Sequence, residues 1–429
     1  MIEIIKYPDS SKWKTLAQRP VLDREDLNNW VKSILEDIRL NGDDAVLNYT
    51  RMFDFAHAET LKVQEDTLKA SAEIVSEALK AAIETAIENI RTFHAAQCES
   101  KKIIQTMSGV QCWRKSVAIE KVGLYIPGGT APLFSTLLML AIPAQIAGCK
   151  EIVVCTPPNK DGKVAPEILY TAYRLGITQV FACGGVQAIG AMAFGTESIP
   201  AVYKIFGPGN QYVTEAKQQI QSWGVAIDMP AGPSEVLVIA EIGANPEFVA
   251  ADLLSQAEHG ADSQVILLTT DEELALYIQQ ELEKQLELLH RKDVTKRSLK
   301  HSRCFILNNR EEMISFSNLY APEHLIIHSE DTQWYENKII NAGSVFMGAY
   351  TPESAGDYAS GTNHTLPTNG YAKNHSGVSV DSFVKKITFQ HITAEGLSLL
   401  GEAVIAMAKS EQLNAHAKAV EIRLKALKS

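Results

Sequence analysis

The stretch that decides the fold covers residues 121–210 and contains four short apolar segments, KVGLYI (121–126), EIVVC (151–155), QVFA (179–182) and AVYKIF (201–206). Glycine or proline follows each segment closely, and residues 166–175 and 210–222 have the pattern of amphipathic helices. Short apolar runs that alternate with helical segments predict parallel strands joined by crossover helices. We therefore expect a doubly wound α/β architecture with right-handed crossovers.

The same pattern continues beyond this stretch. Residues 235–240, 264–268 and 303–307 are further candidate strands, so the strands belong to one sheet or to two. Residues 23–40 and 67–93 have apolar positions at helical spacing. After about Ser376 the chain is expected to be mainly helical, with helices at 395–409 and 411–427 and no strand to anchor them. A helical tail of this kind is expected to pack on a partner subunit.

One long segment without charged side chains, residues 122–149, has the length of a membrane span. Pro127, Pro132 and Pro143 are expected to divide it into a strand, a turn and a short helix, which excludes an unbroken apolar helix. The N-terminus also lacks the basic, apolar and small-residue pattern of a secretion signal. We expect a cytoplasmic protein with no membrane partner.

The composition and net charge of the chain argue against several classes of protein. The chain has 429 residues, with 40 basic and 51 acidic side chains, so its formal net charge is −11. Such a charge repels phosphate backbones, and the basic residues form no cluster, so nucleic acid is not an expected partner. The six cysteines contain no CxxC pair, which argues against a disulfide scaffold and a thiolate zinc site.

Three glycine-rich loops follow candidate strands: YIPGG (125–129), GGVQAIG (184–190) and FGPGN (206–210). Ligands of parallel sheets bind beyond the carboxyl ends of the strands, and backbone amides at helix starts suit a phosphate or dinucleotide. None of these loops is a GxGxxG motif, and Ala191 and Met192 replace the lysine and hydroxyl residue of an ATP-binding loop. Each loop alone is also compatible with a simple chain turn, but the three together favour a ligand.

Several polar residues are candidates for chemistry. Gln256 and His259 lie three apart on an expected helix and face the same direction, although such a pair is more often solvated surface than a metal site. Asp357 lies in a small-residue loop that leads to His364, or it simply caps a turn. Cys149 and Cys155 have apolar neighbours, which favours inert core thiols over nucleophiles.

Glu323 and His324 are an adjacent acid and imidazole after Ala321 and Pro322. Both groups titrate near neutral pH when partly buried, so the pair suits general acid–base catalysis. The same residues are also typical of a helix N-terminus, where proline and glutamate are favoured. The residues by themselves leave both interpretations open.

Longer motifs resemble one enzyme family. The segments IDMPAGPSE (227–235) and DLLSQAEH (252–259) resemble the signature of histidinol dehydrogenases, and YIPGG (125–129), FGPGN (206–210), YAPEH (320–324), GDYASGTNH (356–364) and EQLNAH (411–416) follow in the family's order and spacing. The resemblance extends from about residue 20 to the C-terminus. It implies a zinc-dependent, NAD-linked oxidation of L-histidinol through L-histidinaldehyde to L-histidine, the last step of histidine biosynthesis.

The resemblance also implies an organisation of the chain. Two incomplete Rossmann-like domains are expected, the first from residues 22–124 and 236–378 with most of the zinc and catalytic site, the second from residues 125–235 with the NAD-binding loops. Residues 1–21 and 379–429 are expected to form small helical segments, with the C-terminal ones exchanged in a homodimer.

Site residues are carried over onto matching positions of this sequence. The resemblance implies that one zinc ion per subunit is held by Gln256, His259, Asp357 and His416. It implies that His324 takes the alcohol proton and that Glu323 activates the water that adds to the aldehyde. Together with the zinc ligands and His324, Ser234, His364 and Glu411 are expected to contact the substrate. The residues expected to contact NAD are Tyr125, Gln187 and Asn210.

In the implied homodimer the active sites are shared, because Glu411 and His416 come from the neighbouring subunit. Two other functional classes stay open at this point. One is a zinc hydrolase in which the same ligands activate water and Glu323 is the base. The other is a noncatalytic protein that clamps a small molecule between two lobes.

Overall fold

The structure is a computed structural model that describes residues 2–20, 25–54, 59–128, 132–230 and 232–428. The chain forms two compact units. The first unit consists of Met1–Gln97 and Ile119–Phe383, and the second consists of Cys98–Ala118 and Val384–Ser429. Among the described residues, no helix is long and apolar enough to cross a membrane.

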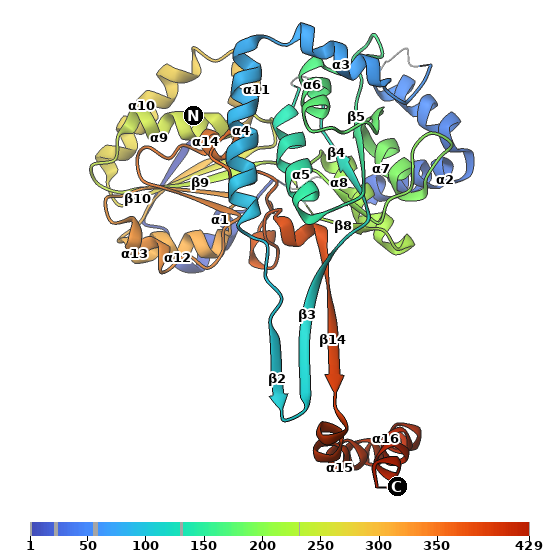
Figure 1. The fold of residues 1–429 in the computed structure, drawn as a ribbon. Helices are drawn as coiled ribbons and strands as arrows, with labels where there is room; N and C mark the ends of the chain where they lie inside the picture. The colour runs from blue at the N-terminus through green and yellow to red at the C-terminus, as the bar shows by residue number, and fades with distance from the viewer. Residues whose placement is uncertain (1, 21–24, 55–58, 129–131, 231, 429) are drawn as a thin grey trace. The chain divides into compact units, whose positions relative to one another are not determined.

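The first unit contains a five-stranded parallel sheet, on the right of Figure 1. Its spatial order is β6 (Val180–Ala182), β5 (Glu151–Thr156), β4 (Lys121–Tyr125), β7 (Lys204–Phe206) and β8 (Ala226–Ile227). In chain order these are the third, second, first, fourth and fifth strands, which is the arrangement of a doubly wound dinucleotide-binding fold. Strands β4 and β7 are therefore the neighbours between which the strand order reverses.

The same unit contains a six-stranded parallel sheet, on the left of Figure 1. Its spatial order is β1 (Glu3–Lys6), β11 (Arg303–Ile306), β10 (Gln264–Thr269), β9 (Glu235–Ala240), β12 (His324–His328) and β13 (Ser344–Met347). Apart from the added edge strand β1, the order again follows a third, second, first, fourth, fifth pattern. The mixed α/β class with parallel sheets is thus confirmed.

Helices cover both faces of each sheet. On the five-stranded sheet, apolar cores form beneath α2 (Glu25–Phe53), α7 (Gly185–Phe194) and α8 (Gln211–Ile220) on one face, and beneath α3 (Glu65–Ile74), α4 (Glu77–Ala95), α5 (Phe134–Ala147) and α6 (Pro166–Arg174) on the other. The six-stranded sheet lies between α9 (Pro246–Ala257), α10 (Glu272–Leu286) and α11 (Lys292–Leu299) and the opposite set α1 (Trp13–Leu16), α12 (Arg310–Tyr320) and α13 (Thr332–Glu336). The remaining helix of this unit, α14 (Glu353–Tyr358), contacts α9.

Every predicted strand segment contains an observed strand, although β7 is shorter than residues 201–206. The predicted helix at 67–93 is two helices, because Ser76 caps α4 by accepting a hydrogen bond from the Leu79 N–H at 3.3 Å. Helix α2 extends beyond residue 40 to Phe53, and its predicted start at residue 23 lies outside the described residues. Pro143 does not end α5, which continues to Ala147.

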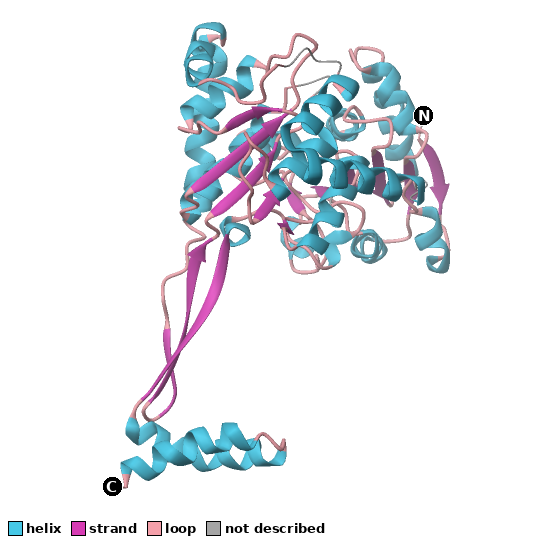
Figure 2. Cartoon of the chain, turned by 90° about the vertical axis from the view of Figure 1, so that its right-hand side faces the viewer, coloured by secondary structure: helices cyan, strands magenta, loops and turns pink. Residues whose placement is uncertain are grey.

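The second unit contains an antiparallel sheet, β14 (Val384–Ile392), β3 (Val110–Ala118) and β2 (Ile103–Met107), followed by the paired helices α15 (Ala394–Ser410) and α16 (Asn414–Leu427). Figure 2 shows these strands in magenta and the helices in cyan. The expectation of no strand after Ser376 is wrong. Strand β14 escapes prediction because most of its side chains are exposed, so no apolar and polar alternation marks it.

The observed packing differs from the predicted domain grouping in two places. Helices α2, α3 and α4 pack on the five-stranded sheet, whereas residues 22–124 were expected beside the six-stranded one. Strand β1 joins the six-stranded sheet, although residues 1–21 were expected to be a separate helical segment. Amphipathic spacing predicts that a helix has a buried face, but it does not predict which sheet that face covers.

Candidate active site

The acid–base pair lies at the start of a buried strand. Helix α12 ends at Tyr320, Ala321 adopts a left-handed conformation with φ of 55°, and His324 is the first residue of β12. Glu323 is 6% exposed and His324 is 3% exposed. The alternative interpretation, that these residues begin a helix, is therefore wrong. Both side chains are buried at the amino end of a strand of the six-stranded sheet.

The imidazole of His324 is surrounded by carboxylates. Its Nδ1 atom lies 3.6 Å from Glu323 Oε2 and 3.7 Å from Glu353 Oε1, and its Nε2 atom lies 3.5 Å from Asp357 Oδ1. The carbonyl of Glu235, the first residue of the adjacent strand β9, is 3.4 Å from Nδ1. The ring thus has acidic neighbours on both nitrogens.

These contacts change the proton affinity of the group. Burial lowers the pKa of His324, but the carboxylates of Glu353, Glu323 and Asp357 outweigh this and raise it well above its usual value. Burial raises the pKa of Glu323 to about 8, while His324 and the Glu235 N–H, which donates to Oε2 at 3.0 Å, oppose that shift. The Glu323 carboxyl is thereby brought into the range that general acid–base catalysis uses.

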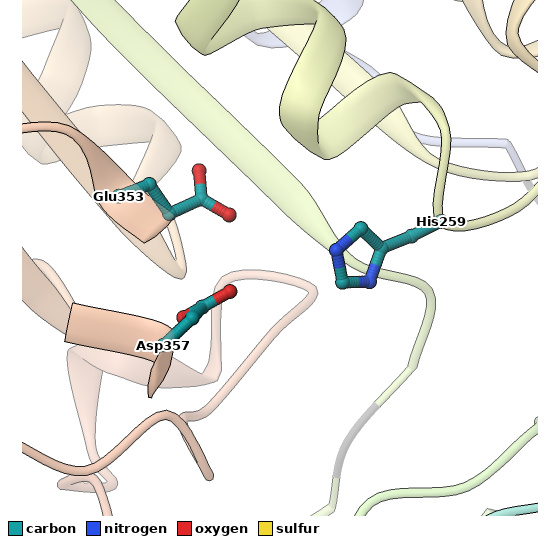
Figure 3. A group of neighbouring side chains, drawn as sticks. All are labelled: His259, Glu353 and Asp357. Carbon is teal, nitrogen blue, oxygen red and sulfur yellow. The ribbon is translucent and has the colours of Figure 1, made fainter. Parts of the chain in front are cut away.

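Next to this pair, three side chains converge on one point. Potential ligand atoms of His259, Glu353 and Asp357 all lie within 4.8 Å of one another. Figure 3 shows both carboxylates, which come from α14, pointing toward the imidazole that follows α9. Ligand atoms around one tetrahedral zinc are about 3.4 Å apart, so this group is close to the spacing that the ion requires.

Gln256 lies beside this group and is fully buried. With its nitrogen turned toward Glu353, the amide donates to that carboxylate and accepts from the Glu235 N–H at 3.1 Å. In the opposite orientation its oxygen faces the carboxylate oxygens, an arrangement that a cation between them would stabilise. His259 follows the end of α9, so the two residues are joined by a turn in which the His259 N–H bonds to the Gln256 carbonyl at 3.3 Å.

Asp357 Oδ1 and His324 Nε2 lie 3.5 Å apart, at the limit of a hydrogen bond, and neither atom has another hydrogen-bond partner among the described residues. Leaving a buried carboxylate oxygen without a hydrogen bond is costly. His324, His364 and His259 lower the pKa of Asp357 despite the opposing effect of burial, which keeps the carboxylate ionised. A buried anionic oxygen whose nearest donor is 3.5 Å away, next to the His259 imidazole and a second carboxylate, fits a divalent cation.

The structure places two of the predicted substrate residues near this cluster. His364 bonds through Nδ1 to the Asp357 carbonyl at 2.8 Å and through Nε2 to the hydroxyl of Thr136, at the start of α5, at 3.1 Å. Ser234 directly precedes Glu235 and lines a small cavity of about 120 Å³. Glu235 is itself anchored there, because Arg19 pairs with its carboxylate and stacks 3.9 Å above the Tyr320 ring.

Glu411 and His416 belong to the second unit, where both are exposed. Glu411 follows the end of α15 and His416 lies in the first turn of α16. Within the first unit the structure therefore brings together Gln256, His259, Glu323, His324, Asp357 and His364, and it does not test the two residues of the second unit.

A separate pocket lies at the carboxyl edge of the five-stranded sheet. It has a volume of about 710 Å³, and Tyr125, Gln187 and Asn210 all line it. Tyr125 ends β4, Gln187 lies in the first turn of α7, and Asn210 caps α8 by accepting from the Tyr212 and Val213 N–H groups. Two helix N-termini thus face a cavity of the size that cofactors occupy. Gly129 of the first predicted loop lies outside the described residues.

The pocket and the acid–base pair lie at opposite ends of the strands of their sheets. The pocket lies beyond the carboxyl ends of β4 and β7, which is where ligands usually bind to parallel sheets. Glu323 and His324 instead lie at the amino end of β12, so the expectation that functional loops follow strands is wrong for the six-stranded sheet. The second glycine loop does open a helix, α7, and the third opens α8.

Sequence reasoning missed Glu353, which is 1% exposed and whose pKa burial raises well above its ordinary value. A signal was present, because Glu353 and Asp357 are four residues apart and such positions share one face of a helix. Thr136 and Glu235 were missed because hydrogen-bonding partners of site residues have no pattern of their own. Burial raises the pKa of the Cys149 thiol to about 11, in agreement with an inert cysteine.

Comparisons with known proteins agree with this geometry. The family model of histidinol dehydrogenase matches residues 17–424. A histidinol dehydrogenase of Bacteroides fragilis is 57% identical over 427 residues, covering 100% of both chains. The chloroplastic histidinol dehydrogenase of Arabidopsis thaliana is 53% identical over 419 residues, covering 97% of this chain and 90% of its own. A crystal structure of histidinol dehydrogenase from Elizabethkingia anophelis has a TM-score of 0.98 and 58% identity, covering 100% of this chain and 99% of its own.

Proposed function

Because the chain belongs to the histidinol dehydrogenase family and is an oxidoreductase, we propose that it oxidises L-histidinol to L-histidine in two NAD-linked steps through L-histidinaldehyde. The observation that supports this most directly is the buried Glu323–His324 pair beside the convergent side chains of His259 and Asp357. The two alternatives, a zinc hydrolase and a noncatalytic binding protein, are not retained, because the family is one of oxidoreductases.

We propose that a zinc ion is held by Gln256, His259 and Asp357 of this chain. Glu353 supplies a second carboxylate next to them, so two negative charges of the protein balance the charge of a divalent cation. A zinc ion held there would supply a positive charge and Lewis-acid chemistry that position the substrate. The protein's own contribution is a set of ligand atoms, from buried Gln256 and Glu353, half-buried Asp357 and exposed His259, that would orient the reacting carbon.

His324 is the proposed base of the first step. Its imidazole accepts the proton of the substrate hydroxyl, while the hydride on the same carbon leaves for the nicotinamide. The surrounding carboxylates stabilise the imidazolium that results, since all three lie within 3.7 Å of its nitrogens. Deep burial keeps bulk water away from the ring.

Glu323 is the proposed base of the second step. Its carboxylate removes a proton from the water that adds to the aldehyde, and the resulting hydrate loses its hydride to a second NAD. The backbone N–H of Glu235 fixes one oxygen of this carboxylate at 3.0 Å, which leaves the other oxygen to act on water. Two adjacent bases therefore serve two successive oxidations.

We propose that NAD binds in the pocket at the carboxyl edge of the five-stranded sheet. The pocket's volume and the two helix N-termini suit the pyrophosphate, and Tyr125, Gln187 and Asn210 supply polar contacts. Glycine is required behind Tyr125, which lines the pocket, because Gly207 has φ of 129° and a Cβ there would meet the Tyr125 carbonyl.

We further propose a homodimer in which Glu411 and His416 of the partner subunit complete each site. The second unit supports this, because many of its apolar side chains are exposed, including Phe389, Leu399, Met407 and Ile422. Mixing inactive His324→Ala and His416→Ala proteins under subunit-exchange conditions tests it. Shared sites predict recovered activity, since one site of the mixed dimer holds both native residues, whereas self-contained sites predict none.

The decisive experiment is the amount of NADH formed per L-histidinol consumed by purified, zinc-loaded protein, with the product identified. Two NADH and histidine support both proposed steps. One NADH with free aldehyde contradicts the role of Glu323, and no NADH contradicts the proposed reaction.

A further inference from the structure

The dinucleotide pocket contains a carboxylate that the proposed reaction does not use. Asp54, the residue after the end of α2, lines the pocket, and among its described lining residues only Asp54 and Lys160 carry a charge. The Asp54 side chain is partly buried, and its Oδ2 atom accepts a hydrogen bond from Gln187 Nε2 at 3.3 Å. Burying a negative charge costs free energy, and this one lies in a pocket proposed for an anionic cofactor. The carboxylate is therefore expected to bind a part of the ligand.

Gln187 adds a second acceptor at the same place. Its Oε1 atom is buried and has no hydrogen-bond partner among the described residues, although the residue is only 1% exposed. The partly exposed Asp54 carboxylate and this unpartnered amide oxygen are thus two acceptors at one place in the pocket. Adjacent hydroxyl groups on a ribose ring supply such donors, and an aspartate or glutamate in dinucleotide-binding folds typically accepts from the 2′-hydroxyl.

Aromatic side chains form the neighbouring wall. Gly42, with φ of 52°, interrupts α2, and Trp30 of its first arm packs against Phe53 at its end with ring centroids 5.3 Å apart. Trp30 also meets Tyr212 at 5.2 Å, and these two rings are 41% and 39% exposed. Exposed aromatic faces beside ribose acceptors suit the stacking of an adenine base.

The sheet order indicates which half of the cofactor lies here. Gln187 follows β6, the edge strand, whereas β4 leads through residue 128 toward α5, whose Thr136 contacts His364 of the catalytic cluster. The nicotinamide has to reach that cluster, so it belongs on the β4 side. The adenosine half then occupies the part of the pocket that Asp54, Gln187 and the aromatic side chains line.

We propose that Asp54 makes this pocket selective for a dinucleotide with a free 2′-hydroxyl, accepting from that hydroxyl and repelling a 2′-phosphate. This inference rests on the proposed NAD-linked function. A like charge brought close to a phosphate is strongly unfavourable, and the repulsion weakens as salt screens it. The selectivity is therefore electrostatic, and it is expected to decline with ionic strength.

The test is calorimetric titration of the purified full-length protein with NAD⁺ and with NADP⁺. For the native protein we expect NAD⁺ to bind more than about tenfold tighter than NADP⁺ at low salt. In Asp54→Asn, whose amide oxygen still accepts from Gln187, we expect that preference to fall at least about tenfold, mainly through tighter NADP⁺ binding. The control variant is Asp161→Asn. Asp161 is exposed and does not line the pocket, although it directly follows lining residues 157–160, so this variant is expected to keep the native preference.

Three results overturn the inference or separate it from the proposed function. An unchanged preference in Asp54→Asn, with NAD⁺ still bound, overturns the role of Asp54 alone. If the native protein's preference for NAD⁺ does not change with salt concentration, an electrostatic origin of that preference is contradicted. This measurement uses the native protein alone, so it does not depend on whether a variant folds. Native protein that binds neither dinucleotide contradicts the NAD-linked function itself.

Discussion

The two parallel sheets of the first unit have the same strand order but carry their functional groups at opposite edges. The five-stranded sheet presents glycine-rich loops, helix N-termini and a pocket at its carboxyl edge. The six-stranded sheet presents buried titratable side chains at the first residues of β9 and β12. Backbone amides suit a mobile anionic cofactor, whereas proton transfer requires side chains fixed by strand backbone, so fold topology does not dictate which edge is used.

The largest expected effect comes from removing the proposed zinc ion. This change is expected to affect only the site at the six-stranded sheet. Chelation is expected to abolish histidinol oxidation and histidinol binding, because Asp357 and His259 lose the ion that orients the substrate. NAD⁺ affinity is expected to change much less, since none of the proposed zinc ligands lines the pocket proposed for NAD. Calorimetry with each ligand checks both, and added zinc should restore activity. Full histidinol binding by protein verified as metal-free would contradict the site.

The next effect is that of His324→Ala. Turnover is expected to fall by about a hundredfold to ten-thousandfold, the contribution of a positioned base, with much smaller changes in KM and NAD⁺ affinity. Steady-state kinetics measures the split. His290→Ala serves as the control, because that side chain is exposed at the end of a turn. A native turnover number in His324→Ala would show that another group is the base.

Glu323→Gln is expected to affect only the second oxidation. The yield should fall from two NADH to about one per histidinol, with aldehyde accumulating, because water is no longer activated. In the native protein, burial raises the pKa of Glu323 to about 8. The group holds its proton below that pH, so oxidation of supplied aldehyde should accelerate as pH rises toward about 8, and Glu323→Gln should lose this dependence. A normal two-NADH yield in the variant would exclude the assignment.

The smallest expected effect is on the other sheet. Gly207→Ala places a Cβ against the Tyr125 carbonyl at φ of 129°, so it should lower the free energy of unfolding by about 1–3 kcal/mol and weaken NAD⁺ binding. Histidinol binding should not change. Gly224→Ala is the matched control, because that glycine has φ of 90° but nothing within 4 Å of its Cβ position. Equal NAD⁺ affinities in the two variants would mean that the close approach is unimportant for the pocket.

The comparison also shows what the sequence could predict. Strands β4 to β7 of the five-stranded sheet were predictable, because runs such as EIVVC are closely followed by proline or glycine and then by amphipathic helices, whereas the two-residue strand β8 was not predicted. Strands β12 and β13 were not, since HLIIH and SVFM are short and follow no regular spacing. The acidic surroundings of His324 depend on Glu353, which reaches it only through the return of α14 to the sheet. Pairings of this kind are set by tertiary packing.

The network around Glu235 connects the extreme N-terminal region to catalysis. Arg19 pairs with the Glu235 carboxylate, and the backbone of the same residue contacts both Glu323 and His324. Proteolytic trimming through residue 19 would leave the buried Glu235 carboxylate without its cation, next to the two side chains proposed to be catalytic. We therefore expect that loss of the segment carrying Arg19 would lower activity, although this segment contributes no residue to the proposed reaction.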